Sequence, residues 1–404
     1  MKVLHINDKT TVSGGVEVYI QNLLPLLRER GIETHWLSTG INDGKAWIES
    51  EDTDWNWHGE SSSLERSPLA ERTDPQTVLH VHSLSEPVLM RQLLKMAAVV
   101  RHMHEPRMFC PGQGKFWGTN ETTCELPFGP HCVLHAYTKR CCNRHPMNLH
   151  KQYRNTHYEV NEASTQYSAI IANSNWIHEE AMRAGYPPET LHHLSYFTPT
   201  LPEPITLEVQ PRVVYTGRLS RTKGVHYLLR AMQQVLLSLP DARLDIVGAG
   251  HDESAFKQLA TELRIQHATT FHGWSNRREV YEITSNASVV AFPSIYPEAF
   301  GISGIEAMML GKPVVGFNVG GISDWLQNGR TGISVPTKDT QAFATGLLRI
   351  LTDEITRESL GKEGRNDAMK KFTPDAHLTR LIAIYTGATH ETSHSNDASF
   401  DVSP

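Results

Sequence analysis

The sequence predicts an α/β protein of two domains, each with a parallel β-sheet covered by helices. Three observations lead to this prediction. The chain has 404 residues, more than one ordinary domain contains. Strand-like and helix-like segments alternate through both halves, as parallel strands with helical crossovers require. A stretch with four prolines, at positions 199, 202, 204 and 211, separates the two alternating series.

The first domain is predicted to span residues 1–198. It opens with an apolar segment, 1–7, that is expected to be a buried strand, and a glycine-containing turn at 11–15 follows. Six apolar side chains then recur on one face of a helix: Val16, Tyr19, Ile20, Leu23, Leu24 and Leu27. Further buried strands are expected at 34–38, 78–82, 97–102 and 168–173.

The second domain is predicted to span residues 199–386, after a proline-rich linker at 198–211. Strands are expected at 212–216, 243–247, 269–272, 287–292 and 313–317. Helices are expected at 225–239, 254–263, 277–286 and 302–310. The last segment, 387–404, is rich in Ser, Thr, His and Asp and is predicted to be disordered.

Composition excludes several classes of protein. Hydrophobic residues make up 39% and charged residues 20%, which is typical of a globular protein. The formal net charge of -6 argues against binding to nucleic acid. No segment reaches the roughly 20 apolar residues that span a bilayer. Polar residues His5, Asn7 and Asp8 interrupt the first apolar run, unlike a secretory signal, so we expect a cytoplasmic protein.

One motif in the second half places two cations beside a glycine turn. Gly217 and Arg218 follow a predicted strand, and Lys223 and Gly224 lead into a helix. The two cations can therefore converge on one anionic group. Taken alone, the motif is equally well explained as a strand–turn–helix with solvated charges.

A second motif lies where the helix at 302–310 begins. Gly301 permits close backbone approach, and the amides of Ile302 and Ser303 point out of the helix N-terminus, which favours a phosphate. Glu306 could hydrogen-bond a vicinal diol such as ribose, and Glu298 a sugar hydroxyl. In isolation, both acids are better explained as ordinary surface and first-turn residues.

These motifs stand in a larger pattern. The stretch 291–315, AFPSIYPEAFGISGIEAMMLGKPVV, resembles the signature of the family 4 retaining glycosyltransferases. Segments at 217–224, 247–250, 271–273, 320–321 and 328–332 match in type, order and spacing, so that the resemblance covers nearly all of residues 212–340. It implies the glycosyltransferase B-type (GT-B) fold, with two Rossmann-like domains facing an interdomain cleft. The nucleotide sugar would bind mainly to the C-terminal domain and the acceptor mainly to the N-terminal one.

The resemblance also implies roles for single residues. Arg218 and Lys223 would hold the donor diphosphate, Glu306 would bind the ribose, and Glu298 would contact the transferred sugar near its reacting carbon. Gly217 and the amides of Phe300, Gly301 and Ile302 would complete the cradle. Family members retain the anomeric configuration and need no divalent metal, and no Asp-x-Asp pair lies near these motifs.

The resemblance therefore predicts a hexosyltransferase that needs no cofactor and no metal. It would move a sugar from a UDP- or GDP-sugar to a glycan or lipid-linked acceptor, in cell-surface polysaccharide or glycolipid synthesis. The motifs do not encode the sugar, the base or the acceptor.

Two features of the first half resemble the family's less closely. Gly14 and Gly15 follow the first strand, as does the family's glycine-rich loop near the donor diphosphate, although they could form only a capped turn. His104 stands where family members often have His-Asp, which implies a catalytic contact in the cleft, while His82 and His102 are competing candidates with a structural interpretation. The family's Asn-Gly-Val-Asp turn is absent, because LSYFTP occupies 194–199.

All five cysteines lie in a loop-like insertion at 105–150: Cys110, Cys124, Cys132, Cys141 and Cys142. The insertion is too long for an ordinary connection, which suggests a functional or cross-linked excursion. No Cys-x-x-Cys pair supports a standard zinc ribbon. Three outcomes stay open, namely a shared metal or cluster, reduced packing thiols, and a disulfide in an oxidising compartment.

A basic stretch overlaps this insertion. Residues 126–158 contain no Asp or Glu but carry Lys139, Arg140, Arg144, Lys151 and Arg154. One hypothesis is that the stretch approaches an anionic acceptor, such as a lipid-linked phosphate, and associates peripherally with the inner face of the membrane. A solvated basic loop is the alternative.

Other functions compatible with the motifs are a phosphorylase, a sugar-nucleotide epimerase, or a sugar-nucleotide-binding protein without transfer. A Rossmann dehydrogenase is disfavoured because Gly-x-Gly-x-x-Gly is absent after the first strand.

Overall fold

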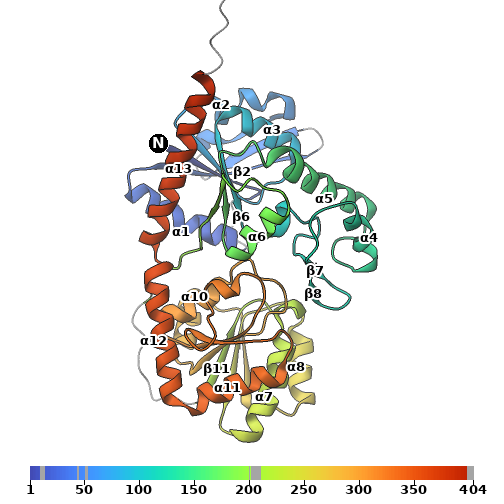
Figure 1. Cartoon of the computed structure of the whole chain (residues 1–404), viewed down its shortest axis with the longest axis vertical. Coiled ribbons are helices and arrows are strands. Elements are labelled where there is room, and N and C mark those ends of the chain that lie inside the picture. The colour runs from blue at the N-terminus through green and yellow to red at the C-terminus, as the bar shows by residue number, and fades with distance from the viewer. Residues whose placement is uncertain (10–13, 43–44, 51–52, 200, 202–210, 398–404) are drawn as a thin grey trace, which may run out of the picture. The chain divides into compact units, whose positions relative to one another are not determined.

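The computed structural model describes all residues except 10–13, 43–44, 51–52, 200, 202–210 and 398–404. The chain divides into two compact units (Figure 1). Unit 1 comprises Met1–Asn120, Cys124–Tyr196 and Asp375–Pro404, and unit 2 comprises Glu121–Thr123 and Phe197–Pro374. Most of the expected linker and residues 11–13 of the expected turn lie outside the described residues.

Unit 1 contains a mixed sheet of eight strands, in the order β10-β9-β6-β5-β1-β2-β3-β4. The parallel strands are β1 Lys2–Asn7, β2 Glu33–Asn42, β5 Thr77–Val81, β6 Ala98–Met103, β9 Ala169–Ala172 and β10 Leu191–His193. Strands β3 Lys45–Ser50 and β4 Trp57–Glu60 add to β2 in antiparallel fashion. These two antiparallel strands extend one edge of the parallel sheet expected for this half and were not predicted. The sequence carries a signal for them, since Asp-Gly at 43–44 is a dipeptide that two-residue hairpins prefer.

Seven α-helices are described in unit 1: α1 Gly15–Glu29, α2 Pro68–Glu71, α3 Pro87–Met96, α4 His131–Thr138, α5 Pro146–Tyr158, α6 Asn175–Arg183 and α13 Pro374–Asp397. Disorder was predicted from residue 387, but α13 continues to Asp397. Leu378, Leu381, Tyr385 and Ala388 recur every three or four residues and are buried, so this helix packs along an apolar face. The domain limit predicted at 386 also differs, because residues from Asp375 on group with unit 1.

Unit 2 contains a sheet of six strands, all paired in parallel, in the order β13-β12-β11-β14-β15-β16. Its strands are β11 Arg212–Thr216, β12 Arg243–Val247, β13 Thr269–Gly273, β14 Val289–Phe292, β15 Val314–Phe317 and β16 Gly332–Val335. Its helices are α7 Val225–Ser238, α8 Glu253–Glu262, α9 Arg277–Ser285, α10 Ile302–Met309, α11 Thr340–Thr352 and α12 Glu354–Lys371. Each strand predicted here from sequence forms within two residues of its expected limits.

Strand order explains where a ligand can bind in unit 2. Strand β11 lies between β12 and β14, so the connections that leave these neighbours run in opposite directions. A crevice opens at such a topological switch point, outside the carboxyl ends of the strands. The loops that follow β11 and β14 carry most of the predicted site residues. None of the described helices is long and apolar enough to cross a membrane.

Candidate functional site

Two loops of unit 2 are joined backbone to backbone at the switch point. The amides of Ile295 and Tyr296, after β14, both donate to the carbonyl oxygen of Thr222, after β11, at 3.0 and 3.2 Å. Gly224 has a φ of 71°, and a Cβ there would lie 1.8 Å from the Pro293 carbonyl oxygen. Only glycine therefore allows this approach, which holds the Lys223 side chain against the second loop.

Lys223 and Glu298 meet across these two loops. The Lys223 Nζ lies 2.6 Å from the Glu298 Oε1, and the Ser294 hydroxyl donates to the same oxygen at 2.6 Å. Glu298 Oε2 has no hydrogen-bond partner among the described residues. The Lys223 side chain is 28% exposed and that of Glu298 is 11% exposed. One carboxylate oxygen is thus fixed, and the other remains available to accept from a ligand hydroxyl.

Arg218 begins the same loop as Lys223. Its carbonyl oxygen accepts from the Tyr215 hydroxyl at 2.9 Å, which fixes the backbone. Its side chain is exposed, and nothing within the described parts of the chain engages the guanidinium in a hydrogen bond or ion pair. Gly217 is closely packed as well, because a Cβ at Gly248 would lie 1.9 Å from its carbonyl oxygen.

Helix α10 presents its N-terminus at the end of the second loop. Gly301 is the N-cap, with a φ of 90°, and the Trp325 indole donates to the Phe300 carbonyl oxygen at 2.7 Å. The first amides of a helix, here those of Ile302 and Ser303, lack intrahelical acceptors and carry the positive end of the dipole. This end of α10 is therefore suited to an anion.

Replacing Gly301 with alanine is expected to weaken nucleotide binding and to destabilise unit 2 by about 1–3 kcal/mol. Alanine at this φ is strained, and its Cβ would lie 2.9 Å from the Phe292 ring. Thermal unfolding and calorimetric titration with UDP and GDP would measure both effects. Gly185→Ala is the matched control, because Gly185 also has a positive φ of 96° but a Cβ there meets nothing within 4 Å. Nucleotide affinity equal to wild type in Gly301→Ala would contradict the expectation.

Glu306 lies in α10 and faces α9. The Tyr281 hydroxyl donates to Glu306 Oε1 at 3.1 Å, and an Arg277 guanidinium nitrogen lies 3.7 Å from the same oxygen. Burial raises the pKa of Glu306, while Arg277 and the Tyr281 hydrogen bond lower it. Oε2 has no partner in the described structure. As at Glu298, one carboxylate oxygen is held and the other is left for a ligand.

Three residues that contact the carboxylates of Glu298 and Glu306 were not predicted from the sequence: Ser294, Arg277 and Tyr281. A signal existed for two of them. Arg277 and Tyr281 are four residues apart in a predicted helix, so they share a helical face. Nothing in the pattern indicated that this face meets Glu306, because that contact depends on how α9 and α10 pack.

Gly14 and Gly15 belong to unit 1, at the start of α1. Gly14 is the exposed N-cap of the helix, and Gly15 is its first residue. Behind them, the buried Glu17 carboxylate accepts from the Asn7 side-chain amide at 3.3 Å. Residues 10–13 of the same loop, including Ser13, lie outside the described residues.

His104 also belongs to unit 1 and is part of a buried histidine cluster with His5, His80, His82 and His102. Its Nε2 lies 2.7 Å from His82 Nδ1, and its Nδ1 contacts the Tyr196 hydroxyl. His104 is only 6% exposed, and both of its ring nitrogens are engaged. Burial lowers the pKa of each of the five histidines, so they are neutral at pH 7. A contact between His104 and substrate would first require this network to open.

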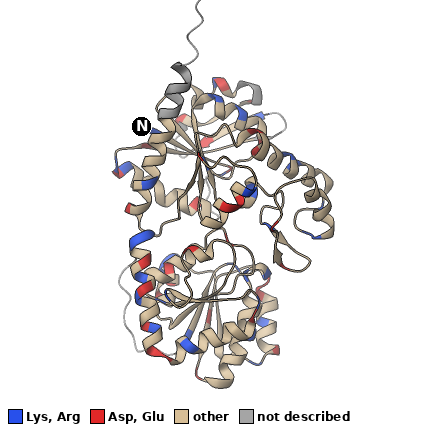
Figure 2. Ribbon diagram, in the orientation of Figure 1, with Lys and Arg blue, Asp and Glu red and all other residues tan. Residues whose placement is uncertain are grey.

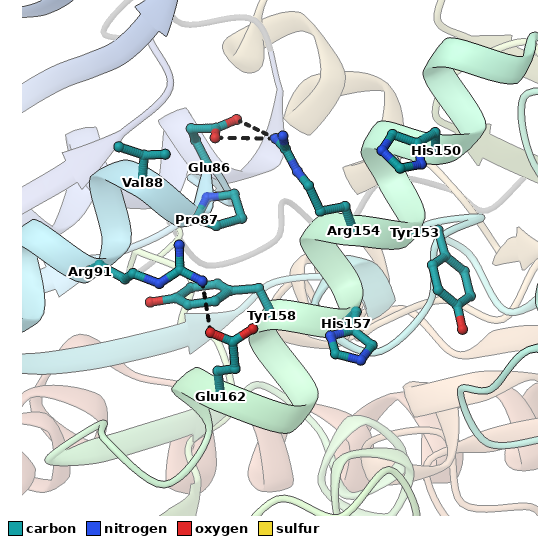
Figure 3. A pocket seen from close by; sticks show the side chains of 10 residues that line it. All are labelled: Glu86, Pro87, Val88, Arg91, His150, Tyr153, Arg154, His157, Tyr158 and Glu162. Carbon is teal, nitrogen blue, oxygen red and sulfur yellow. Dashed lines mark hydrogen bonds and ion pairs between the residues drawn. The ribbon is translucent and has the colours of Figure 1, made fainter.

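A cavity of about 350 Å³ in unit 1 lies between α3 and α5 (Figure 3). Its cations are already paired, with Arg154 3.2 Å from Glu86 and Arg91 2.7 Å from Glu162. The Arg91 guanidinium also lies 4.6 Å from the centre of the Tyr158 ring. The basic stretch predicted to meet an anionic acceptor thus has one of its arginines neutralised. Figure 2 shows basic and acidic residues interspersed in both units.

Comparison with known proteins bears mainly on unit 2. Residues 200–367 match the family model described as Glycosyl transferases group 1. An uncharacterized glycosyltransferase of Methanocaldococcus jannaschii is 33% identical over 173 residues, which is 43% of this chain and 44% of that protein. The D-inositol 3-phosphate glycosyltransferase of Corynebacterium aurimucosum is 34% identical over 182 residues, 44% of this chain and 43% of that protein. The matches thus span less than half the length of these curated relatives.

Structural similarity extends over both units. Anabaena HepE in complex with UDP superposes with a TM-score of 0.66 and 17% sequence identity, covering 96% of this chain and 100% of that one. At this identity the similarity establishes the fold alone. Together the comparisons place residues 200–367 within the Glycosyl transferases group 1 model and give the whole chain the GT-B fold of two Rossmann-like units.

Proposed function

We propose that this protein is a retaining glycosyltransferase that uses a nucleotide-diphosphate sugar as donor. The observation that carries the proposal is the Lys223–Glu298 contact of 2.6 Å at the switch point of unit 2, beside the N-terminus of α10. A cation and a carboxylate are in contact there, and the N-terminus of a helix follows the carboxylate closely in the sequence. The matched family model and the UDP bound to HepE support this choice.

Charge stabilisation is the proposed source of catalysis. When the bond between the anomeric carbon and the donor phosphate oxygen breaks, negative charge develops on the departing diphosphate. Lys223, Arg218 and the amides of the Phe300–Ile302 segment would stabilise that charge without a divalent metal. The acceptor hydroxyl attacks the same face of the sugar, and its proton passes to the leaving phosphate oxygen. Glu298 positions the sugar and forms no covalent bond.

The remaining acid sets the orientation of the donor. Glu306, held by Tyr281 at one oxygen, would accept both hydroxyls of the ribose through the other. The acceptor would be a glycan or lipid-linked sugar in polysaccharide or glycolipid synthesis, bound by unit 1. Gly14, Gly15 and His104 are the proposed contributions of that unit. No observation favours an epimerase, a phosphorylase or a silent binding protein over transfer.

The first test is release of nucleoside diphosphate from a panel of UDP- and GDP-sugars with saccharide acceptors. We expect turnover in excess EDTA, and a product whose anomeric proton shows the donor's configuration by NMR. Arg218→Ala is expected to lower kcat/KM by about 100-fold, because one of the two cations facing the leaving group is lost. Arg349→Ala, another exposed arginine of unit 2, is the control and should leave turnover unchanged.

Two results would contradict the proposal. Donor binding without release of diphosphate would favour a binding protein, and inverted product would exclude the retaining mechanism. Undiminished turnover in Arg218→Ala would remove that residue from the site.

A further inference from the structure

Four of the five cysteines of unit 1 line one small cavity. Cys110, Cys124, Cys132 and Cys141 all line it, together with Lys115, His135 and an apolar shell that includes Trp117 and Phe128. Its volume of about 20 Å³ exceeds the 10–15 Å³ that a single water-sized sphere occupies and excludes any organic ligand. Neither Asp nor Glu lines the cavity. Its size and its donors therefore suit one thiophilic cation.

The backbone is shaped to bring these cysteines together. A Cβ at Gly112 would lie 2.3 Å from the Cys141 carbonyl oxygen, so the segment after Cys110 packs directly on the segment that carries Cys141. The Cys124 amide donates to the Lys115 carbonyl oxygen at 2.6 Å, which closes the loop between Cys110 and Cys124. Gln113 and Lys115 have left-handed φ values of 62° and 51°. Non-glycine residues hold such conformations only where their surroundings fix them.

Lys115 lines the same cavity, but its ammonium is not available to a thiolate. The nearby Lys115 ammonium is already used, 2.7 Å from Glu180 and 2.5 Å from the Leu126 carbonyl oxygen. No other Lys or Arg is among the residues that line the cavity, so a bound cation is left to neutralise the thiolates.

We infer that Cys110, Cys124, Cys132 and Cys141 form a tetrathiolate site for one Zn²⁺ ion. Among the described residues, the groups whose ligand atoms all lie within 4.8 Å of one another consist of histidines, so the cysteine sulfurs must move closer to bind metal. A change of χ1 rotamer moves a cysteine sulfur by up to about 3 Å, so rotation of the side chains is the movement by which the site would close. The ion would fix a long insertion that has little regular structure of its own, as structural zinc sites do.

Metal analysis of the purified full-length chain tests this inference. We expect one zinc ion per chain in the wild type and its loss in Cys110→Ser, Cys124→Ser, Cys132→Ser and Cys141→Ser. Cys142→Ser is the matched control, because Cys142 is adjacent but does not line the cavity, and it should keep the ion. Cobalt substitution should give the intense thiolate-to-cobalt charge-transfer band that histidine ligands do not produce.

A second measurement uses the wild-type protein, so that its result does not depend on whether the cysteine variants fold. An organomercurial that consumes thiols should release zinc to a chromogenic chelator in step with cysteine modification. Zinc retained in Cys141→Ser would show that Cys141 is not a ligand. Zinc retained in all cysteine variants would overturn the cysteine site and indicate that the metal binds at the histidine cluster. A disulfide between Cys141 and Cys142 in unreduced protein, or the visible absorption of an iron–sulfur cluster, would overturn the site as proposed.

Discussion

Replacing Lys223 with alanine is expected to lower kcat/KM for sugar transfer by about 10²–10³-fold. The ammonium lies 2.6 Å from Glu298 Oε1 and stands beside the helix end where the leaving diphosphate is proposed to bind. Its removal takes away a cation that is already positioned before the reaction begins. It also leaves Glu298, with a side chain only 11% exposed, with the Ser294 hydroxyl as its remaining partner at Oε1.

Steady-state kinetics with calorimetric donor binding would measure this effect. Lys257→Ala is the matched control, since Lys257 forms an exposed ion pair with Glu253 in the same unit. A double-mutant cycle with Glu298→Gln would show whether the two residues act as one device, in which case the losses do not add. Unchanged kcat/KM in Lys223→Ala would remove the charge-stabilisation mechanism from this site.

The sequence predicted the strands and helices of residues 212–317 closely because its signals there are local, whereas β16, α11 and α12 were not predicted. Buried parallel strands are short apolar runs, and β11, β12 and β14 are each followed directly by a glycine or proline, so limits such as those of β11 and β12 follow from the pattern alone. Unit 1 was predicted less well for a physical reason. Strands β3 and β4 extend an edge of the sheet and lack the continuous apolar run of a buried strand.

In the candidate site too, features marked by local sequence signals could be predicted, and contacts that depend on packing could not. Glycines and helix starts mark the positions of Lys223 and Gly301 in the sequence, whereas Glu298 was assigned to the site only through the family resemblance. The partners of Glu306 could not be predicted, since Tyr281 reaches it through packing of α9 against α10. The environment of His104 could not be predicted either. The five histidines come from three separate segments, at 5, 80–82 and 102–104, which become neighbours because β1, β5 and β6 are adjacent in the sheet.

The second large effect concerns a buried ion pair in unit 1. Arg101, in β6, lies 2.7 Å from the Glu159 carboxylate, and both side chains are fully buried. The Tyr167 hydroxyl donates to the other Glu159 oxygen at 2.7 Å. Arg101 also donates to the carbonyl oxygens of His82, at 2.6 Å, and Leu84. The pair therefore fixes the segment that follows β5 and carries His82 into the histidine cluster.

Replacing Glu159 with glutamine is expected to destabilise unit 1 by about 3–5 kcal/mol, because it leaves the Arg101 charge buried without a counter-charge. Glu162→Gln is the matched control: it breaks the pair with Arg91, whose side chains are 50% and 44% exposed, and should cost less than about 1 kcal/mol. Thermal unfolding would measure both, with hydrogen exchange resolving the two units, since a protein of two units need not unfold in one step.

An Arg101→Met, Glu159→Leu double variant separates charge from shape. If the cost in Glu159→Gln arises from an unpaired charge, removing both charges should restore much of the stability. The carbonyl oxygens of His82 and Leu84 would still lose their donor, so hydrogen exchange should remain faster in the segment after β5 than in wild type. Equal stability of Glu159→Gln and wild type would show instead that the pair contributes nothing to the unit, and that the segment after β5 is held by its packing alone.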